Sequence, residues 1–376
     1  MRDLLAHADL ARYAGQFVWL ELSYDEEGNR AFMTKFGASA TPTFFVVDFH
    51  DEHVIAMQPG VMSLAEVTQF LDRGTSGFIA KTQTPADIAL TRGDAVLADK
   101  PAEAAKAYQE ALRLTPDNWP HRELTEASLV QALQDSSQWQ QCAETSAIDA
   151  AAMKRDVIFV RTVVGGMWCL ASTDPAPWAE ATLHKLQPLA EEALTLPTTV
   201  RDHRDAIYRT LMFISINRKD NAAAAKWGGS WLAELDAIKP RSDDERSALD
   251  IARVENIQVY GDPERILPAL IESERAMAHN YIASLRLAQM EKAAKHYDEA
   301  IAACDRGLAR APGANGRAWL LQIKADALKS KGKVLEARQA LEQALQAAQE
   351  IPTQMGRDMN ISMIQNMLKT TEEPPK

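Results

Sequence analysis

His296–Gly313 has the sequence HYDEAIAACDRGLARAPG. In this stretch Ala300, Cys304, Gly307 and Pro312 follow one another at intervals of 4, 3 and 5 residues. Intervals of three and four put side chains on one face of a helix, where small residues let a second helix approach closely. Proline ends such a helix because it cannot continue the backbone hydrogen bonding. The stretch therefore predicts a helix that packs closely on a neighbouring helix and ends before Pro312.

The pattern resembles the second helix of a tetratricopeptide repeat, in which Ala, an aromatic residue, Ala and Pro take these places. Cys304 stands where the aromatic residue is usual, and Gly307 stands where Ala is usual. The preceding ASLRLAQMEKAAKH offers Leu287 and Ala288 where the family has Leu and Gly. The resemblance implies a two-helix unit that cannot bury its apolar face alone, so several units stack.

Stretch 317–350 repeats the intervals of 4 and 3, and stretch 86–116 repeats all three. Their spaced residues are Ala337, Leu341 and Ala344 after a turn at Gly332, and Ala104, Tyr108, Ala111 and Pro116 after Gly93. Between them the pattern stays helical with weaker motifs. Further hairpins are expected at 129–150, 156–196, 201–238 and 243–278. We expect about six or seven helical hairpins in a right-handed curved array.

The first 80 residues have a different pattern, with short apolar runs that are typical of strands. Strands are expected at 17–22 (FVWLEL), 44–47 (FFVV) and 54–57 (VIAM), the last two joined by a polar hairpin. Helices are expected at 26–36, closed by Gly37, and from Ser63 to just before Gly74, with Glu66 completing a capping box.

The order of these elements, with Thr-Pro directly before the final hairpin, resembles the thioredoxin fold from about Gly15 to Gly74. In thioredoxins the loop before a cis proline lies against the active-site Cys-x-x-C and holds an extended peptide substrate. The resemblance implies this role for Thr41 and Pro42. The fold class expected is α/β plus all-α, a truncated thioredoxin-like domain followed by a tetratricopeptide-type solenoid. The whole resembles bacterial proteins that join the two.

The sequence contains no Cys-x-x-C, and it begins after the place where the thioredoxin resemblance puts that motif. Three explanations are open. The start codon is assigned too late and the motif lies upstream of Met1, or the domain is a redox-inactive remnant, or the chain is a truncation. Translating the gene upstream of Met1 separates them.

The chain of 376 residues has a formal net charge of -11. Such an acidic chain is a poor nucleic-acid binder, because phosphate contacts need clustered Lys and Arg. No apolar stretch reaches the length of a membrane helix, so no membrane partner is expected. The N-terminus has no signal-peptide pattern. The expected location is cytoplasmic, or periplasmic if an upstream start adds a signal peptide.

His50 and His53 form an H-x-x-H near Asp48, Asp51 and Glu52. A metal site is one interpretation of this cluster. The tip of a hairpin with solvated polar residues is favoured, because no third strong ligand is fixed in space. No metal and no cofactor are therefore predicted.

The three cysteines, Cys142, Cys169 and Cys304, are far apart in sequence. An odd count without close spacing argues against a disulfide scaffold and against a zinc site, and it fits a reducing compartment. Each is interpreted as a small buried helical residue, since each falls on an apolar or small-residue face. Cys142 and Cys169 lie on neighbouring predicted hairpins, so this pair is the candidate for close approach.

Asp202, His203, Arg204 and Asp205 cluster near Tyr208. A catalytic histidine is conceivable, but a helix start with its charges on the exposed side is favoured, because Asp near a helix start is expected from the helix dipole. Tryptophans of the helical part are interpreted as buried between hairpins, with one or two lining a groove. They are Trp119, Trp139, Trp168, Trp178, Trp227, Trp231 and Trp319.

The expected organisation is a thioredoxin-like domain at 1–80, a linker at 81–85, a repeat domain at 86–370 and a tail at 371–376. The favoured function is protein–protein interaction, with a protein or peptide partner in the repeat groove and no catalytic residues. The alternative is a thiol-disulfide oxidoreductase of the thioredoxin family whose Cys-x-x-C lies upstream of Met1.

Overall fold

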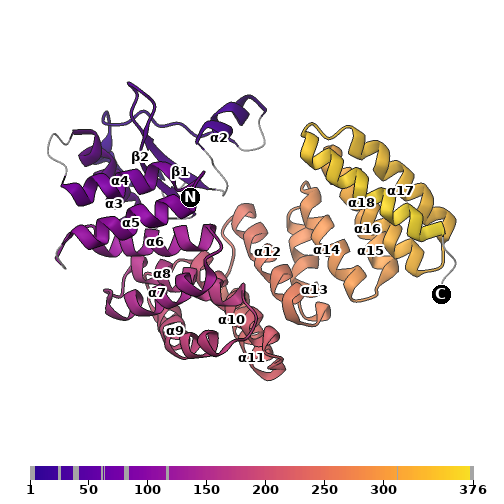
Figure 1. Cartoon of the computed structure of the whole chain (residues 1–376). Coiled ribbons are helices and arrows are strands. Elements are labelled where there is room, and N and C mark those ends of the chain that lie inside the picture. Colours follow the sequence, from indigo (N-terminus) through magenta and orange to yellow (C-terminus); the bar gives the residue numbers. More distant parts are fainter. Residues whose placement is uncertain are drawn as a thin grey trace. The chain divides into compact units, whose positions relative to one another are not determined.

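A computed structural model describes residues 5–23, 27–36, 42–60, 62, 64–79, 84–115, 118–310 and 312–372 (Figure 1). The chain divides into two compact units, residues 1–224 and 225–376. Among the described residues the first unit holds a small α/β segment and a run of helices, and the second unit is helical. The predicted limits at 80, 86 and 370 stay a prediction.

The described β-structure is one antiparallel pair, β1 (Thr43–Val47) and β2 (Val54–Pro59). Its register places Phe45 opposite Met57. Both predicted strands of the hairpin are confirmed. The turn after β2 uses Gly60 at φ +85°, a conformation that favours glycine, and its backbone N–H donates to the carbonyl oxygen of Pro42 at 2.8 Å.

Three helical segments accompany the sheet: η1 (Ala8–Tyr13), the short turn η2 (Glu27–Asn29) leading into α2 (Arg30–Phe36), and α3 (Leu64–Ile79). The helix predicted at 26–36 is present in this form. Helix α3 packs on β2 and buries Val67 and Leu71, which are four residues apart. These residues join a core with Val46 and Ile55 of the sheet. Gly37 and Ser63 lie outside the described residues.

Two predictions for this segment are wrong. Residues 17–22 form no strand: Phe17 packs on the core, whereas Val18 and Leu20 are 89% and 75% exposed. A strand is stabilised by a paired neighbour, and the described sheet gives this stretch none. Helix α3 also does not end before Gly74. It continues because Gly74 packs against Val46, where a Cβ would lie 2.7 Å from Val46 Cγ2.

The helices of the first unit pack consecutively (Figure 1). They are α4 (Pro85–Val96), α5 (Pro101–Leu114), α6 (Arg122–Asp135), α7 (Trp139–Ala152), α8 (Val157–Ala171), α9 (Pro177–Thr195) and α10 (Arg201–Asn217). Their starts are encoded locally. Thr84 and Asp87 form a capping box around the first turn of α4, and the Asp156 carboxylate accepts from the backbone N–H of Ile158 at the start of α8.

Helix α11 (Asn221–Ala237) spans the division between the units. The second unit continues with α12 (Asp243–Tyr260), η3 (Pro263–Arg265), α13 (Leu267–Ala276), α14 (Tyr281–Ala293), α15 (Tyr297–Ala309), α16 (Ala314–Ser330), α17 (Val334–Gln349) and α18 (Gln354–Glu372). Consecutive helices from α12 onward pack on one another. The helix pairs predicted from the sequence are present in the described residues, so the solenoid of helical hairpins is confirmed.

The spaced small residues do what the sequence predicts. Ala104, Tyr108 and Ala111 of α5 are fully buried, and the Tyr108 ring fills the space over Gly93 of α4. A Cβ on Gly93 would lie 2.7 Å from Tyr108 Cδ1. In the second unit Ala300 and Cys304 of α15, and Ala337 and Ala344 of α17, are also fully buried. Close helix approach at small residues therefore builds both ends of the array.

Candidate functional site

A groove runs between α14 and α16 in the second unit, with an open volume of about 290 Å³. Its lining residues are Leu285, Gln289 and Lys292 of α14 and Trp319, Gln322 and Ile323 of α16. On α14 these residues follow at intervals of four and three, so they share one face. The remaining faces of α14 bury Leu287 and Ala288, which match the repeat motif. Leu285 is itself buried, whereas Gln289 and Lys292 are partly exposed, so the groove combines buried and partly exposed surface of α14.

Trp319 gives the groove a large apolar surface, since 41% of its side chain is exposed. Gln322 is held in place next to it. The Gln322 Nε2 group donates to the Ala318 carbonyl oxygen at 3.1 Å and to Asn360 Oδ1 on α18 at 3.3 Å. Asn360 in turn donates to the Gly356 carbonyl oxygen at 2.8 Å. These bonds fix the amide and leave its carbonyl oxygen as the group with acceptor capacity.

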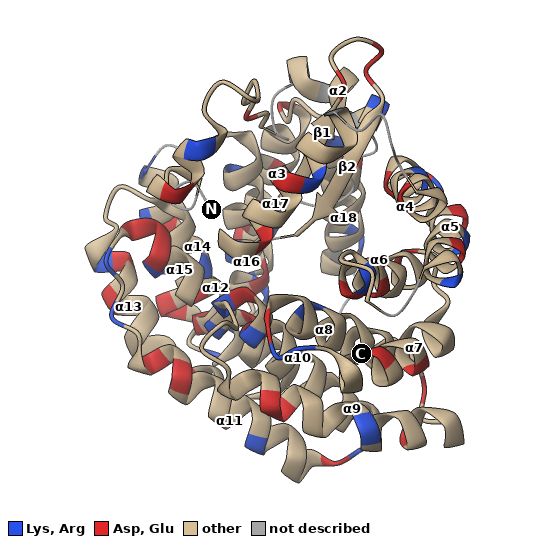
Figure 2. Ribbon diagram, turned by 90° about the vertical axis from the view of Figure 1, so that its left-hand side faces the viewer, with Lys and Arg blue, Asp and Glu red and all other residues tan. Residues whose placement is uncertain are grey.

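The positive charge of Lys292, which lines the groove, is paired with a carboxylate of the same chain. Lys292 Nζ lies 2.9 Å from Asp326 Oδ2 on the neighbouring α16. Both side chains are partly exposed, so the pair is solvent-screened and contributes little to stability. The pair matters more for ligand preference than for stability, because it neutralises a positive charge that would otherwise favour an acidic partner. Figure 2 shows the same mixture of both signs of charge along the helices.

A second cluster is a buried charge network in the first unit. Arg73 Nη1 of α3 lies 3.0 Å from Asp94 Oδ2 of α4, and the Tyr108 hydroxyl donates to Asp94 Oδ1 at 2.8 Å. Arg161 Nη1 of α8 donates to Gln58 Oε1 of β2 at 2.7 Å. The same nitrogen lies 3.6 Å from the Glu66 carboxylate of α3. The network ties the α/β segment to α4, α5 and α8.

Burial is the largest cause of the pKa shifts in this network. The pKa of Asp94 is raised by burial, which outweighs the opposing charge of Arg73. Burial raises the pKa of Tyr108 well above its usual value and lowers the pKa of Arg161. The cavity beside Arg73 and Arg161 is about 10 Å³, enough for one water molecule. A space of this size holds no substrate, so the cluster is structural.

The polar cluster at the start of α10, which was predicted to lie on an exposed helix face, is partly buried. The helix begins at Arg201, but His203, Asp205 and Tyr208 are buried and not on an exposed face. The reason is that α10 packs on α8 along this side. Burial lowers the pKa of His203, against the charge of Glu66. Burial therefore favours the neutral form of this side chain.

At the hairpin tip, Asp48, Asp51 and His53 place one ligand atom each within 4.8 Å of one another. His53 Nδ1 and Asp51 Oδ1 are 2.5 Å apart, and the backbone N–H of His50 donates to Asp48 Oδ1 at 2.8 Å. The hydrogen bond to His53 lowers the pKa of Asp51. Asx-type bonds of this kind are typical of turns, and the side chains are exposed or half-buried.

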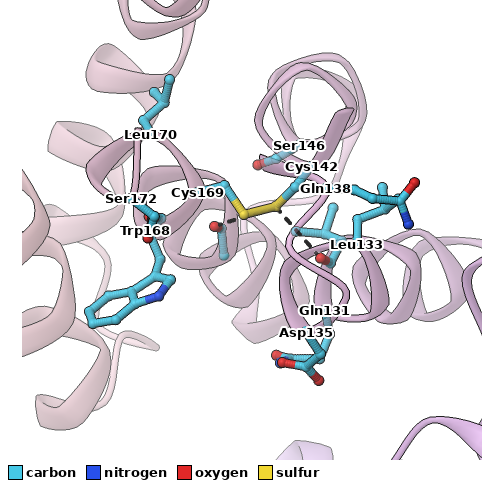
Figure 3. Close-up of a disulfide and its surroundings, with 12 residues drawn as sticks. Gln131, Leu133, Asp135, Gln138, Cys142, Ser146, Trp168, Cys169, Leu170 and Ser172 are labelled. Atoms are coloured by element: carbon cyan, nitrogen blue, oxygen red, sulfur yellow. Dashed lines mark hydrogen bonds between the residues drawn. A yellow bond between two sulfur atoms is a disulfide. The ribbon is translucent and has the colours of Figure 1, made fainter. Parts of the chain in front are cut away.

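The cysteines are closer to one another than the sequence indicated. Cys142 of α7 and Cys169 of α8 form a disulfide, and both are fully buried (Figure 3). The prediction that each cysteine is a small buried helical residue is confirmed, but the argument against a disulfide is wrong for this pair. Cys304 is a free buried cysteine, and burial raises the pKa of its thiol to about 12. A thiol with this pKa is a poor nucleophile at neutral pH.

Of the two residues given a substrate-binding role, Thr41 lies outside the described residues. Pro42 is half-buried and precedes β1. The described cysteines all lie on helices α7, α8 and α15. The role of Thr41 and Pro42 stays a prediction.

Sequence reasoning placed one or two tryptophans in a groove, and Trp319 lies there. Trp227 and Trp231 are buried, as expected. Sequence reasoning missed Leu285, Gln289, Lys292, Gln322 and Ile323. The available signal was their place on the first helices of the two best repeats, between the motif positions that are buried.

The chain matches one family model and is similar to solved structures. Residues 247–360 match the Tetratricopeptide repeat-like domain family. The chain is similar to a tetratricopeptide repeat protein from Parabacteroides merdae ATCC 43184, at 10% identity and a TM-score of 0.43, over 77% of this chain and 99% of that one. It is also similar to the TPR2AB domain of yeast Sti1 in a pHSP90 complex, at 15% identity and a TM-score of 0.30, over 77% of this chain and 98% of that one. No curated protein matches the sequence.

The family match covers the groove and the repeat helix at 296–313. The predicted tetratricopeptide-like repeats are confirmed there. The described β-structure, a single pair of strands, does not establish a thioredoxin-like domain. In the described part of the chain, no helix is both long and apolar enough to cross a bilayer.

Proposed function

We propose that this chain is a protein-interaction scaffold that binds a peptide segment of a partner in the groove between α14 and α16. The observation that supports this is the groove itself. It places an exposed tryptophan beside the fixed amide of Gln322, on a tetratricopeptide-like array. Exposed aromatic anchors with polar neighbours are the typical composition of a binding hot spot.

The lining residues indicate what the segment is like. Trp319, Leu285 and Ile323 favour an apolar side chain, while the amides of Gln289 and Gln322 can bond the peptide backbone. Because Lys292 is paired with Asp326, an acidic group on the ligand gains little. The favoured ligand is a neutral, largely apolar segment.

In this proposal the α/β segment caps the first end of the helical array. A repeat array needs a terminal element that covers its last apolar face. Helix α4 packs on β2, and the Arg73–Asp94 and Arg161–Gln58 contacts fix the segment to the helices. The cap is thus a structural part of the first unit.

The test uses the full chain as bait for a random peptide library displayed on phage. Selected peptides are then titrated by fluorescence anisotropy against wild type, Trp319→Ala and Trp168→Ala. Trp168 is the matched control, since 37% of its side chain is exposed, on α8 outside the groove. We expect Trp319→Ala to weaken binding at least about tenfold and Trp168→Ala to change it less than about twofold.

Equal binding of the selected peptides to wild type and Trp319→Ala would contradict the groove as the site. Circular dichroism checks that each variant is folded. The oxidoreductase alternative requires a Cys-x-x-C, which the sequence lacks. An insulin-reduction assay on this chain is expected to be negative, and activity would overturn the scaffold proposal.

A further inference from the structure

Helices α7 and α8 approach each other unusually closely at a row of small residues. A Cβ on Gly166 of α8 would lie 2.5 Å from Ser146 Cβ of α7, and one on Gly165 would lie 2.8 Å from Val130 Cγ1 of α6. The Ser146 hydroxyl donates to the Thr162 carbonyl oxygen across the same interface, at 2.8 Å. Only glycine leaves room for these contacts, so Gly166 sets the spacing of α8 from α7 and Gly165 sets its spacing from α6.

One turn away from these contacts, the same spacing brings Cys142 and Cys169 together. Cys142 precedes Ser146 by four residues and Cys169 follows Gly165 by four, so each cysteine continues its small-residue face. Their Cα atoms are 6.2 Å apart, within the range a disulfide needs. Figure 3 shows the bond lying between the two helices.

The sulfur atoms are enclosed on every side. Both cysteines have no exposed surface, and Cys142 Sγ lies 3.7 Å from the Val130 carbonyl oxygen and 3.8 Å from that of Gly165. In thiol–disulfide exchange, the attacking sulfur must come into contact with the sulfur that it attacks. An oxidant of any size therefore cannot reach this pair once α6, α7 and α8 have packed.

We propose that Cys142–Cys169 is a folding staple that is made in an oxidising compartment before the α6–α8 interface closes. The required co-reactant is a disulfide donor, either a thiol-oxidase protein or a small disulfide. The Cys142 thiolate attacks the donor disulfide and releases one donor thiolate. The Cys169 thiolate then attacks Cys142 Sγ and releases the second, so two electrons pass to the donor and two thiol protons are lost.

The consequence for the protein's location follows from the chemistry of compartments. Disulfides persist in the periplasm, in the secretory pathway and outside cells, and they are rare in a reducing cytoplasm. The staple therefore favours an exported or lumenal protein. It also closes a loop with a sequence separation of 27 residues, which restricts the unfolded chain.

The test counts free thiols with a maleimide under denaturing, non-reducing conditions, followed by intact-mass measurement. The full chain is made in a host with a reducing cytoplasm and, separately, in a host with an oxidising cytoplasm. We expect three adducts from the first and one from the second, the remaining adduct being on Cys304. Cys304→Ser is the control and should lower each count by one. Three adducts from the oxidising host would overturn the proposal.

The order of events is tested on the reduced protein. Oxidised glutathione is added either to the folded chain or during refolding from urea. We expect the folded chain to keep three adducts for hours, while the refolding chain reaches one. Equally fast oxidation of both would contradict formation before packing.

The stability effect is measured on Cys142→Ser/Cys169→Ser, in which the new hydroxyl at 142 lies near the Val130 carbonyl oxygen as an acceptor. We expect the melting temperature of the first unit to fall by about 10 °C. An unchanged melting temperature would show that the bond is no staple. If the variant fails to fold, the thiol counts on the wild-type chain still show whether the disulfide forms and whether it forms before packing.

Discussion

Two helix interfaces of this chain use the same packing device with different consequences. Between α7 and α8, Gly166 packs on Ser146, and the nearby cysteines are bonded. Between α15 and α16, Gly307 packs on Leu320, and the nearby Cys304 is free. In both places a missing Cβ brings helices close and a buried cysteine lies on the same face. A partner cysteine on the next helix is present in the first interface only.

The difference reflects how regular the repeats are. The second unit contains the motif positions that match the repeat family, and its helices pack through Ala and Gly. Side chains of α14 and α16 line a groove in this unit. Buried charge pairs are present in both units, Arg73–Asp94 in the first and Arg253–Asp250 in the second. The disulfide lies in the first unit, where it adds a covalent bond to helices that both units otherwise hold by packing and buried charge.

The largest effect is expected where the charge network is broken. Arg161→Ala removes the cation that faces Gln58 and Glu66, and Glu66 is almost completely buried. Loss of one partner of a buried ion pair costs about 3–5 kcal/mol of unfolding free energy. Hydrogen–deuterium exchange, resolved by peptide, should show faster exchange in α3 and α8. Peptides of the second unit should keep their wild-type exchange rates.

The matched control is Arg92→Ala, since Arg92 pairs with Glu110 at the surface. An exposed pair contributes about 1 kcal/mol or less. If Arg161→Ala and Arg92→Ala speed exchange equally, the buried network adds nothing to the first unit, and the comparison between the two units fails.

A second prediction tests the glycines of the two interfaces directly. Gly166→Ala forces a methyl group against the rigid Cβ of Ser146, so we expect a loss of about 2 kcal/mol. Gly307→Ala places its Cβ 2.9 Å from the two methyl carbons of the buried Leu320 and 3.1 Å from Ser284 Cβ, a looser fit than at Gly166, so we expect a loss of about 1 kcal/mol. Urea denaturation followed by circular dichroism measures both.

Gly229→Ala is the control for helix propensity, because a Cβ there approaches nothing closer than Arg265 Nη1 at 3.9 Å. This variant should be neutral or more stable by about 0.5–1 kcal/mol. A loss at Gly307 as large as that at Gly166 would show that the two interfaces are equally tight.

The sequence predicted the structural features that depend on residues close together along the chain, such as the buried faces of helices. Intervals of four and three at Ala300, Cys304 and Gly307 specify a helix face, and such a face is a local property. The strand expected at 17–22 failed because a strand needs a partner that its own residues do not encode. The disulfide was missed for a similar reason: Cys142 and Cys169 lie on different helices, and they meet where Gly166 lets α8 pack closely on α7.

The groove between α14 and α16 could be predicted from the sequence only in part. Gln289, Lys292 and Trp319 occupy exposed or partly exposed positions between the motif residues, which a helical pattern can predict. Leu285 and Gln322 are buried, and a helical pattern does not assign them to a groove. That Trp319 and Leu285 border one hollow depends on how two helices stack. Likewise His203 has the local signature of an exposed helix start, and packing of α10 on α8 buries it.

The smallest effect is expected from a pH change at His296, in the turn between α14 and α15. Its Nδ1 lies 2.8 Å from Glu291 and its Nε2 lies 2.9 Å from Glu264 of η3. These carboxylates raise the pKa of His296, the Glu291 hydrogen bond most of all. A histidine whose pKa is higher in the folded state adds stability that is complete below its unfolded pKa of about 6.5 and is lost as pH rises through the folded pKa. Urea midpoints of the second unit should therefore decline from pH 6 to pH 9 less steeply in His296→Gln than in wild type. Parallel curves for the two proteins would mean that this bridge between η3 and α14 carries no pH dependence.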